Sequence, residues 1–178
     1  MMRSRYMLLL ALGAALVGPA LAQGPGSALK GHDSSQPVDI AAERIEVQDR
    51  ADRVLITGNV DVRQGNLRLN APRITVAYAS TDGIDIERID ATGGVVLRSP
   101  EETARSQSAV YDLGQGIVTM LGNVQLTRGG DNVQGGRLVI DLDTGRAVMD
   151  GGVPGAPGSA APTTGRVTGR FTVAPRGN

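Results

Sequence analysis

The sequence contains no cysteine, one histidine and no tryptophan, with three tyrosines and one phenylalanine among its 178 residues. Without cysteine there is no disulfide framework, no thiol nucleophile and no cysteine-ligated zinc site. A single histidine excludes a metal site with several imidazole ligands. A formal net charge of +0 argues against a broad nucleic-acid-binding surface. Because hydrophobic residues make up 40% and aromatics 2%, any core must be aliphatic, and the length favours one domain.

The first 22 residues have the pattern of a secretory signal peptide. Arg3 and Arg5 form a basic start, an apolar run extends over residues 7–17, and Ala20-Leu21-Ala22 matches an A-x-A cleavage site. We therefore predict cleavage after Ala22. An uncleaved N-terminal membrane anchor is the alternative. No second long hydrophobic run follows, so we expect the mature protein to be soluble.

Composition divides the remaining chain into three parts. Residues 23–36 are rich in glycine and serine and predict a flexible lead-in. Residues 37–150 carry the regular pattern of a β domain. Residues 151–178 form a Gly/Pro-rich tail that offers little apolar surface to offset the entropy of ordering. Within the tail, residues 166–174 regain strand character. The sequence leaves open whether this segment docks on a sheet edge or is simply tail.

From residue 37 to residue 150 apolar and polar residues alternate with a period of two rather than 3.6. Successive side chains of a strand point to opposite faces, so each alternating pair puts aliphatic groups on one face and polar groups on the other. The runs are short and separated by Gly, Asn, Asp or Pro, as strands require. No segment has convincing helical spacing. The aliphatic pairs are Val38/Ile40, Ile45/Val47, Val60/Val62, Leu67/Leu69, Ile74/Val76, Ile84/Ile86, Val124/Leu126 and Leu138/Ile140.

A short motif also recurs along the domain. Gly58-Asn59-Val60, Gly93-Gly94-Val95 and Gly122-Asn123-Val124 are each predicted to open a strand, and a second strand follows about 15 residues later. The glycine supplies a backbone conformation closed to most other residues, and asparagine tolerates the same region. A motif that recurs along a chain in this way indicates one supersecondary unit stacked on its neighbours. The expected architecture is an elongated all-β stack.

The aliphatic face continues across every repeat and has two interpretations. It is either an ordinary sealed core or a trough that holds apolar chains. Burial of a methylene group is worth about 0.8 kcal/mol, so exposing a 12-carbon acyl chain to water costs roughly 10 kcal/mol. A carrier of lipids through an aqueous compartment must therefore shield such chains continuously. The alternation alone does not separate the two interpretations, because both need the same inward residues.

The ends of an open stack are a second feature. Pro37 precedes Val38-Asp39-Ile40, and proline in a sheet is confined to a strand start or an edge. This indicates a terminal strand whose outer edge is free to pair with another chain. Head-to-tail pairing of this kind produces filaments rather than closed rings.

Three segments resemble the LptA/OstA family of periplasmic lipopolysaccharide transport proteins. The first runs from Gln36 to Glu43 with the sequence QPVDIAAE. The second runs from Thr57 to Gly65 (TGNVDVRQG) and continues through Leu67, Leu69 and Ile74. The third opens with Leu121 to Leu126 (LGNVQL) and continues through Asn132-Val133, Gly135, Leu138 and Ile140. The similarity covers residues 36–150, and more weakly 166–174.

The resemblance implies an elongated β-jellyroll of two antiparallel sheets that open like a V, with an apolar groove between them. It implies a non-enzymatic, periplasmic carrier that binds the acyl chains of lipopolysaccharide. It also implies head-to-tail assembly into a bridge from the inner to the outer membrane. The partners would be LptC-like and LptD-like jellyroll domains and further copies of the same chain. No cofactor, metal or nucleic acid is expected.

We predict that the groove is lined by ten aliphatic residues, with ordinary core as the alternative for each. Four arginines, Arg44, Arg63, Arg68 and Arg73, either contact lipid phosphates at the groove mouth or belong to a polar outward face, and we favour the face. The predicted groove residues are Val38, Ile40, Ile45, Val47, Val60, Val62, Leu67, Leu69, Ile74 and Val76.

Other candidate sites are weaker. A hydrolase triad around His32 would need rigid placement that the lead-in does not promise. Glu43, Glu46, Asp49 and Asp52 could act as paired carboxylates, but their spacing indicates a solvated face. Asp141, Asp143 and the stretch 129–132 suggest a calcium turn only faintly, because the motif does not recur in register.

Two other functions remain as rivals. One is a polymerising structural β-stack with a sealed core and no lipid cargo. The other, ranked last, is a β-solenoid enzyme acting on polysaccharide, for which the sequence offers no aromatic sugar platform.

Overall fold

The computed structural model describes residues 32–33, 35–80, 85–151 and 165–172, so the predicted signal peptide and most of the lead-in and tail lie outside the described residues. The described chain is all-β, as predicted, with a single 3-10 turn at Asp49–Ala51 (η1). The strands are β1 (Val38–Ala41), β2 (Arg44–Gln48), β3 (Arg53–Gln64), β4 (Leu67–Ala79), β5 (Asp85–Arg98), β6 (Glu102–Asp112), β7 (Ile117–Arg128), β8 (Asp131–Asp141), β9 (Arg146–Asp150) and β10 (Thr168–Arg170).

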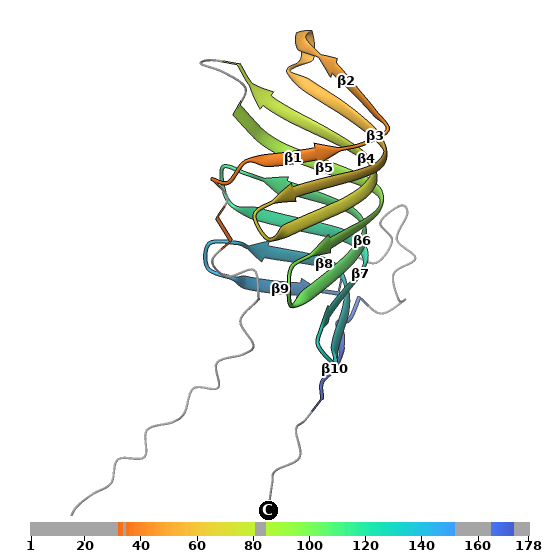
Figure 1. The fold of residues 1–178 in the computed structure, drawn as a ribbon. Coiled ribbons are helices and arrows are strands. Elements are labelled where there is room, and N and C mark those ends of the chain that lie inside the picture. The colour runs from red at the N-terminus through yellow and green to blue at the C-terminus, as the bar shows by residue number, and fades with distance from the viewer. Residues whose placement is uncertain (1–31, 34, 81–84, 152–164, 173–178) are drawn as a thin grey trace, which may run out of the picture.

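All ten strands belong to one antiparallel ladder. β1 and β2 pair with opposite halves of β3, and β9 and β10 pair with opposite halves of β8. The long strands between them bend on the same side of the molecule (Figure 1), so the ladder forms two arms that face each other. These arms correspond to the two sheets of the expected jellyroll.

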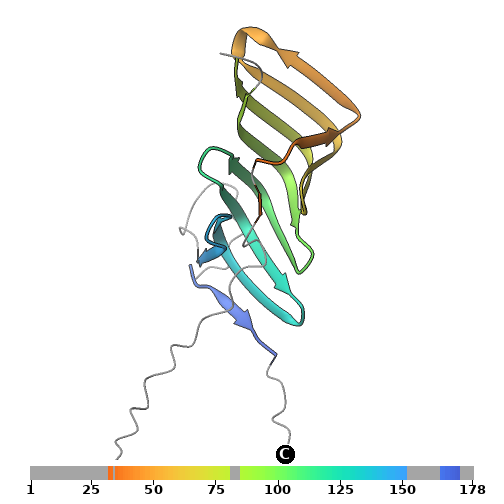
Figure 2. The same cartoon turned by 60° about the vertical axis from the view of Figure 1, so that its left-hand side comes forward.

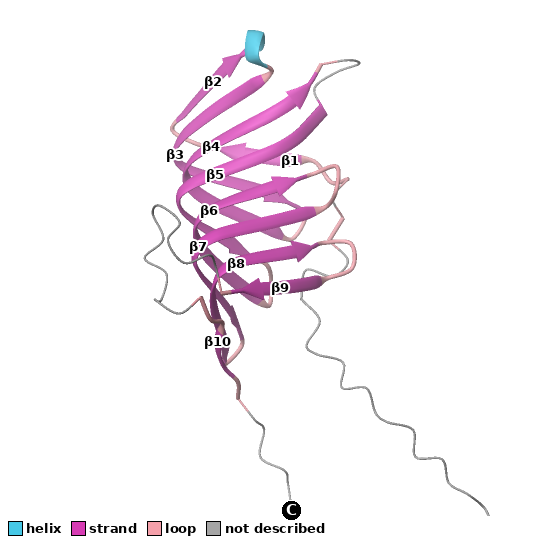
Figure 3. Cartoon of the chain, turned by 180° about the vertical axis from the view of Figure 1, so that it is seen from behind, coloured by secondary structure: helices cyan, strands magenta, loops and turns pink. Residues whose placement is uncertain are grey.

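We name the arms by their first strands. The β1 arm consists of β1, residues 60–64, 67–71, 95–98, 102–106, 124–128 and 131–135, and β10. The β2 arm consists of β2, residues 53–57, 73–79, 85–92, 108–112, 117–121 and 137–141, and β9. Seen from behind, the strands of the stack follow one another from β2 to β9 (Figure 3).

The bend between the arms is a line of bulges that crosses the sheet. The strand register shifts between Thr57 and Val60 in β3, and the same occurs at residues 92–95 of β5 and 121–124 of β7. The extra residues have positive φ angles, 83° at Gly58 and 45° at Asn59 for example. A bulge bends its strand and increases its twist. The repeated Gly-Asn motif therefore lies inside strands and does not open them, which corrects the prediction.

Aliphatic residues of both arms form one continuous core between them. Ile74, Val118, Met120, Val124 and Leu138 are completely buried. No buried side-chain nitrogen or oxygen in the described parts of the chain lacks a hydrogen-bond partner. The alternation of the sequence is thus realised as an apolar interior and a polar exterior.

Two short strands form each end of the stack. β1 and β2 lie at one end, and β9 and β10 lie at the other (Figures 1 and 2). β10 pairs with β8 through Thr168–Gln134 and Arg170–Asn132, and the Thr172 amide donates to the Asp131 carboxylate at 2.7 Å. Residues 168–170 therefore dock on a sheet edge, one of the two arrangements that the sequence left open.

Candidate functional site

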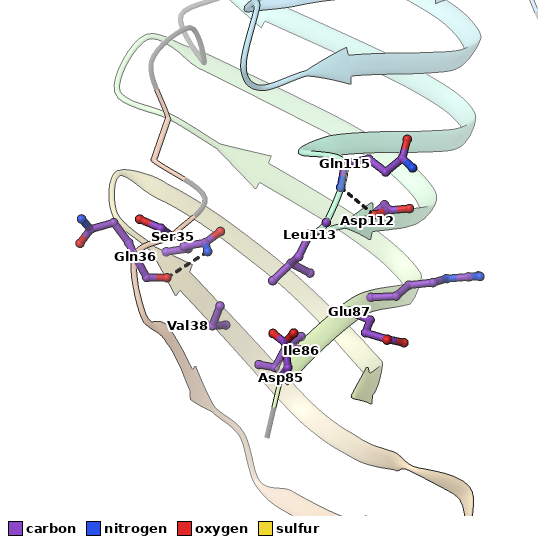
Figure 4. Close-up of a pocket in the computed structure, with 12 residues that line it drawn as sticks. Ser35, Gln36, Val38, Asp85, Ile86, Glu87, Asp112, Leu113 and Gln115 are labelled. Atoms are coloured by element: carbon purple, nitrogen blue, oxygen red, sulfur yellow. Dashed lines mark hydrogen bonds between the residues drawn. The ribbon is translucent and has the colours of Figure 1, made fainter. Parts of the chain in front are cut away.

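An open cleft of about 830 Å³ lies between the arms, lined by strand ends and turns away from the bulges of the bend. Ser35, Gln36 and Val38 lie on one side of it, with Ile86 and Leu113 across from them (Figure 4). The whole lining is Ser35, Gln36, Val38, Gln64, Asp85, Ile86, Glu87, Arg88, Asp112, Leu113, Gly114 and Gln115.

The charged residues of this cleft are mostly acidic. Asp85, Glu87 and Asp112 line it together with one basic residue, Arg88. Arg88 is paired with Asp90 at 2.6 Å, and the hydrogen bond to that carboxylate raises the pKa of the guanidinium. The mouth is therefore not built as a basic anion site. Its apolar surface comes from Val38, Ile86 and Leu113.

Behind the cleft lies a small apolar cavity of about 20 Å³. It has little polar surface because seven of its nine lining residues are aliphatic. Val38 and Gln64 line both the cleft and the cavity, so they mark the boundary between the open mouth and the packed interior. The cavity is lined by Val38, Val62, Gln64, Leu67, Leu69, Ile89, Leu97, Tyr111 and Val118.

A buried polar cluster lies at this boundary. The Tyr111 hydroxyl donates to Gln64 Oε1 at 2.9 Å, and His32 Nε2 lies 3.1 Å from the same oxygen. Gln64 Nε2 donates to the carbonyl of Gln36 at 3.0 Å. His32 is only 6% exposed, so the end of the predicted flexible lead-in is anchored against the domain. Its two ring nitrogens lie 3.1 and 3.3 Å from the side-chain amide oxygens of Gln64 and Asn66, rather than beside the partners of a hydrolase triad.

The ten predicted groove residues fall into three groups. Val60, Val62, Leu67, Leu69, Ile74 and Val76 are buried in the core, and Val38 and Ile40 are half-buried against it. Ile45 and Val47 share the inner face with their partners Ile56 and Val54 but are 53% and 60% exposed. They lie on β2, the terminal strand of its arm, and no further strand among the described residues covers them. Within the predicted set, only Val38, Val62, Leu67 and Leu69 border the cavity.

Several residues around the cleft and cavity were missed. Ile89, Leu97 and Val118 follow the same alternation in later strands, so extending the pattern beyond the first repeat would have found them. The alternation of aliphatic residues does not identify Gln64 or Tyr111, because neither is aliphatic and a glutamine at the end of a strand is not unusual.

The four candidate arginines lie away from the cleft. Arg63 and Arg68 both bind Asp61, at 2.8 and 2.6 Å, and Arg44 pairs with Glu46. The hydrogen bonds from Arg68, followed by those from Arg63, hold the pKa of the Asp61 carboxyl well below its usual range. Since Arg73 is exposed and none of the four lines the cleft, the preferred outward-face interpretation describes them better than lipid phosphate contacts.

One of the weaker candidates, Asp141, has a structural role. Asp141 accepts hydrogen bonds from the amides of Asp143 and Thr144, and the Thr144 hydrogen bonds lower the pKa of its carboxyl. Asp141 therefore caps the turn that joins β8 and β9. Within the described residues, no group of three or more His, Asp or Glu is arranged to hold a metal ion, and no helix has the length and apolarity to cross a membrane.

The fold and the cleft define a class of protein: an elongated β-jellyroll whose single bent sheet encloses an aliphatic interior that opens at one side. The chain belongs to the LptA/(LptD N-terminal domain) LPS transport protein family, whose model matches residues 39–146. This confirms the resemblance found in the sequence.

The chain is also similar to individual proteins. An uncharacterized protein of Rhizobium meliloti (strain 1021) is 34% identical over 149 residues, which cover 78% of this chain and 80% of that protein. The lipopolysaccharide export system protein LptA of Escherichia coli (strain K12) is 28% identical over 121 residues, 64% of each chain. The LPS-assembly protein LptD of Photobacterium profundum is 27% identical over 149 residues, 83% of this chain but 18% of LptD.

A solved structure has the same fold. The crystal structure of LptH, the LptA homologous periplasmic component of the lipopolysaccharide transport device of Pseudomonas aeruginosa, superposes with a TM-score of 0.69. The match covers 80% of this chain and 99% of LptH at 19% sequence identity. At this identity the likeness establishes the fold.

Proposed function

We propose that this protein is a periplasmic carrier that binds lipopolysaccharide and passes it from the inner toward the outer membrane. The observation that carries the proposal is the continuous aliphatic layer between two arms that are joined at one side and open at the other. Acyl chains would lie in this layer, and the sugars would remain in water outside the mouth. The family membership supports the cargo.

Binding requires the arms to move apart. The interior cavity of about 20 Å³ is too small for an acyl chain, so a chain must take the place of contacts between side chains of the two arms. Burial of a 12-carbon chain recovers roughly 10 kcal/mol, which is enough to offset the loss of several such contacts. No catalytic group or cofactor is needed. Directionality would come from an ATP-driven extractor upstream and from handing lipid between equivalent grooves.

The ends of the stack suit assembly into a bridge. β1 and β2 at one end, and β9 and β10 at the other, have outer edges that no other described strand covers. Exposed strand edges accept a strand from another chain. At the β2 edge, Ile45 and Val47 also present apolar side chains. The partners we propose are a second copy of this chain and the jellyroll domains of LptC-like and LptD-like proteins.

The proposal is tested by measuring lipopolysaccharide binding to the purified protein. Ile40→Asp places a charge on the half-buried inner face of β1, and Asp39→Asn changes its outward neighbour on the same strand. We expect Ile40→Asp to abolish binding while the circular dichroism spectrum is unchanged, and Asp39→Asn to bind like wild type. Equal binding by wild type and Ile40→Asp would contradict the proposed groove.

A polymerising scaffold without lipid is the second candidate, because the core residues between the arms are tightly packed. Chain elongation that depends on protein concentration, with no lipid bound or co-purified, would favour this function.

A further inference from the structure

The two arms are joined by a hydrogen bond at their open side. Gln64 ends β3 in the β1 arm, and Tyr111 lies near the end of β6 in the β2 arm. The Tyr111 hydroxyl donates to Gln64 Oε1 at 2.9 Å, in a buried position. Gln64 and Tyr111 are 4% exposed each. This contact therefore connects the arms directly, far from the bend that joins them covalently.

The pair also stands where the open cleft meets the interior. Gln64 lines both the cleft and the apolar cavity, and Tyr111 lines the cavity. The phenol ring of Tyr111 thus forms part of the apolar wall of the cavity, and its hydroxyl group is hydrogen-bonded to Gln64 at the boundary with the cleft. An apolar chain that enters from the cleft meets this pair before it reaches Leu67 and Leu69.

Four described residues that precede β1 also lie at this boundary. We call His32, Asp33, Ser35 and Gln36 the strap. His32 Nε2 lies 3.1 Å from Gln64 Oε1, and the Gln36 carbonyl accepts a hydrogen bond from Gln64 Nε2 at 3.0 Å. The strap is itself held by Asp33, whose carboxylate accepts hydrogen bonds from the Ser35 amide, the Ser35 hydroxyl and the Gln36 side chain.

We propose that Gln64 and Tyr111, with the strap, form a gate that controls entry of apolar chains into the interior. This inference rests on the proposed function and adds to it the residues that must separate first. Polar side chains suit a gate, because when the gate opens they can replace their mutual hydrogen bonds by hydrogen bonds to water in the cleft. The gate is closed in this structure and opens when the arms part.

Opening is measured first without lipid. The protein has no cysteine, so Pro100→Cys and Gln115→Cys provide the only two spin-label sites. Both are exposed residues, one in the β5–β6 turn of the β1 arm and one in the β6–β7 turn of the β2 arm. In this labelled protein we expect Tyr111→Phe to shift the distance distribution between labels to longer and broader values.

Tyr78→Phe is the matched control. Tyr78 is also a buried tyrosine of the β2 arm, but its hydroxyl donates to Asp49, away from the gate. We expect it to leave the distance distribution unchanged. Identical distributions for wild type and Tyr111→Phe, or equal shifts for the two phenylalanine variants, would overturn the gate.

The second measurement is the rate at which an environment-sensitive fluorescent fatty acid enters and leaves the full protein in stopped flow. Tyr111→Phe should raise both rates about fivefold, the effect of about 1 kcal/mol at 1.4 kcal/mol per tenfold, while the equilibrium affinity changes much less. Gln64→Leu should act in the same direction. Probe binding with unchanged rates would overturn the gate and leave the carrier intact, whereas no binding of either probe or lipopolysaccharide by wild type would overturn the carrier as well.

Discussion

Gly58 occupies the bulge of β3, where the backbone must turn from one arm into the other. Its φ angle is 83°, and an added Cβ would collide with the side chain of Glu43. Gly94, in the corresponding bulge of β5, has a φ angle of 98° but no atom within 4 Å of the place of a Cβ. Substitution of Gly94 therefore measures the cost of backbone strain alone, whereas substitution of Gly58 measures the cost of strain together with a steric clash.

We predict that Gly58→Ala lowers the free energy of unfolding by about 2–4 kcal/mol, and Gly94→Ala by about 1–2 kcal/mol, since only the first adds a clash to the strain. Urea denaturation of the two variants measures both values. Equal midpoints for Gly58→Ala and Gly94→Ala would mean that contact with Glu43 contributes nothing.

Asp61 is the acceptor at the centre of a polar network on the outer face of the β1 arm. It receives hydrogen bonds from Arg68 and Arg63, and one from Asn70 at 3.1 Å. Its side chain is 14% exposed. Because these bonds favour the charged carboxylate, the pKa of Asp61 is lower in the folded protein than in the unfolded chain.

We predict that Asp61→Asn lowers stability by about 1–2 kcal/mol at pH 7. A lowered folded pKa contributes stability that is complete above the unfolded value of about 3.9 and is lost as the pH falls below it. The difference between the wild-type and variant melting temperatures should therefore shrink from pH 5 to pH 2. A difference that stays constant over this range would refute the assigned role of the carboxylate.

At the scale of elements, the position of a strand in the stack decides whether its inward-facing residues are buried or exposed. Ile45 and Val47 have the same inward parity as Ile56 and Val54, yet they are exposed because β2 is the last strand of its arm. Parity in the sequence predicts the face of a residue, but it does not tell which strand stands at an edge.

This edge gives a prediction about assembly. Val47→Glu should weaken self-association at least tenfold, because a charge replaces an apolar side chain at the proposed contact between copies. Monomer stability should hardly change, since Val47 is 60% exposed. Sedimentation velocity over a range of concentrations measures the association. Glu46→Gln, on the opposite face of the same strand, is the control, and equal weakening by both variants would argue against an apolar contact.

At the scale of the whole molecule, the period-two pattern was sufficient to predict an all-β stack with an aliphatic interior. The repeat of glycines is visible in the sequence, but the prediction that these glycines open strands is wrong, because Gly58, Gly93 and Gly122 lie at bulges inside strands. A local motif cannot distinguish a strand start from a bulge, because both use positive φ angles and only the pairing partners differ.

The candidate site was less predictable than the fold. The hydrogen bonds of Gln64 join it to His32 and Tyr111, which are 32 and 47 residues away in the sequence. Such a contact depends on how the arms meet, and no local pattern encodes it. The inward aliphatic residues, in contrast, follow directly from alternation, so most of the predicted groove set lies in the interior.

The central claim, that acyl chains lie between the arms, is tested most directly by photo-crosslinking in living cells. A photoreactive amino acid is placed at Ile40, on the inner face of β1, or at the adjacent outward residue Asp39. Crosslinked protein is then probed for lipopolysaccharide. The account predicts a lipopolysaccharide adduct at position 40 and none at position 39. Adducts of equal strength at both positions, or none at position 40 in a folded protein, would contradict it.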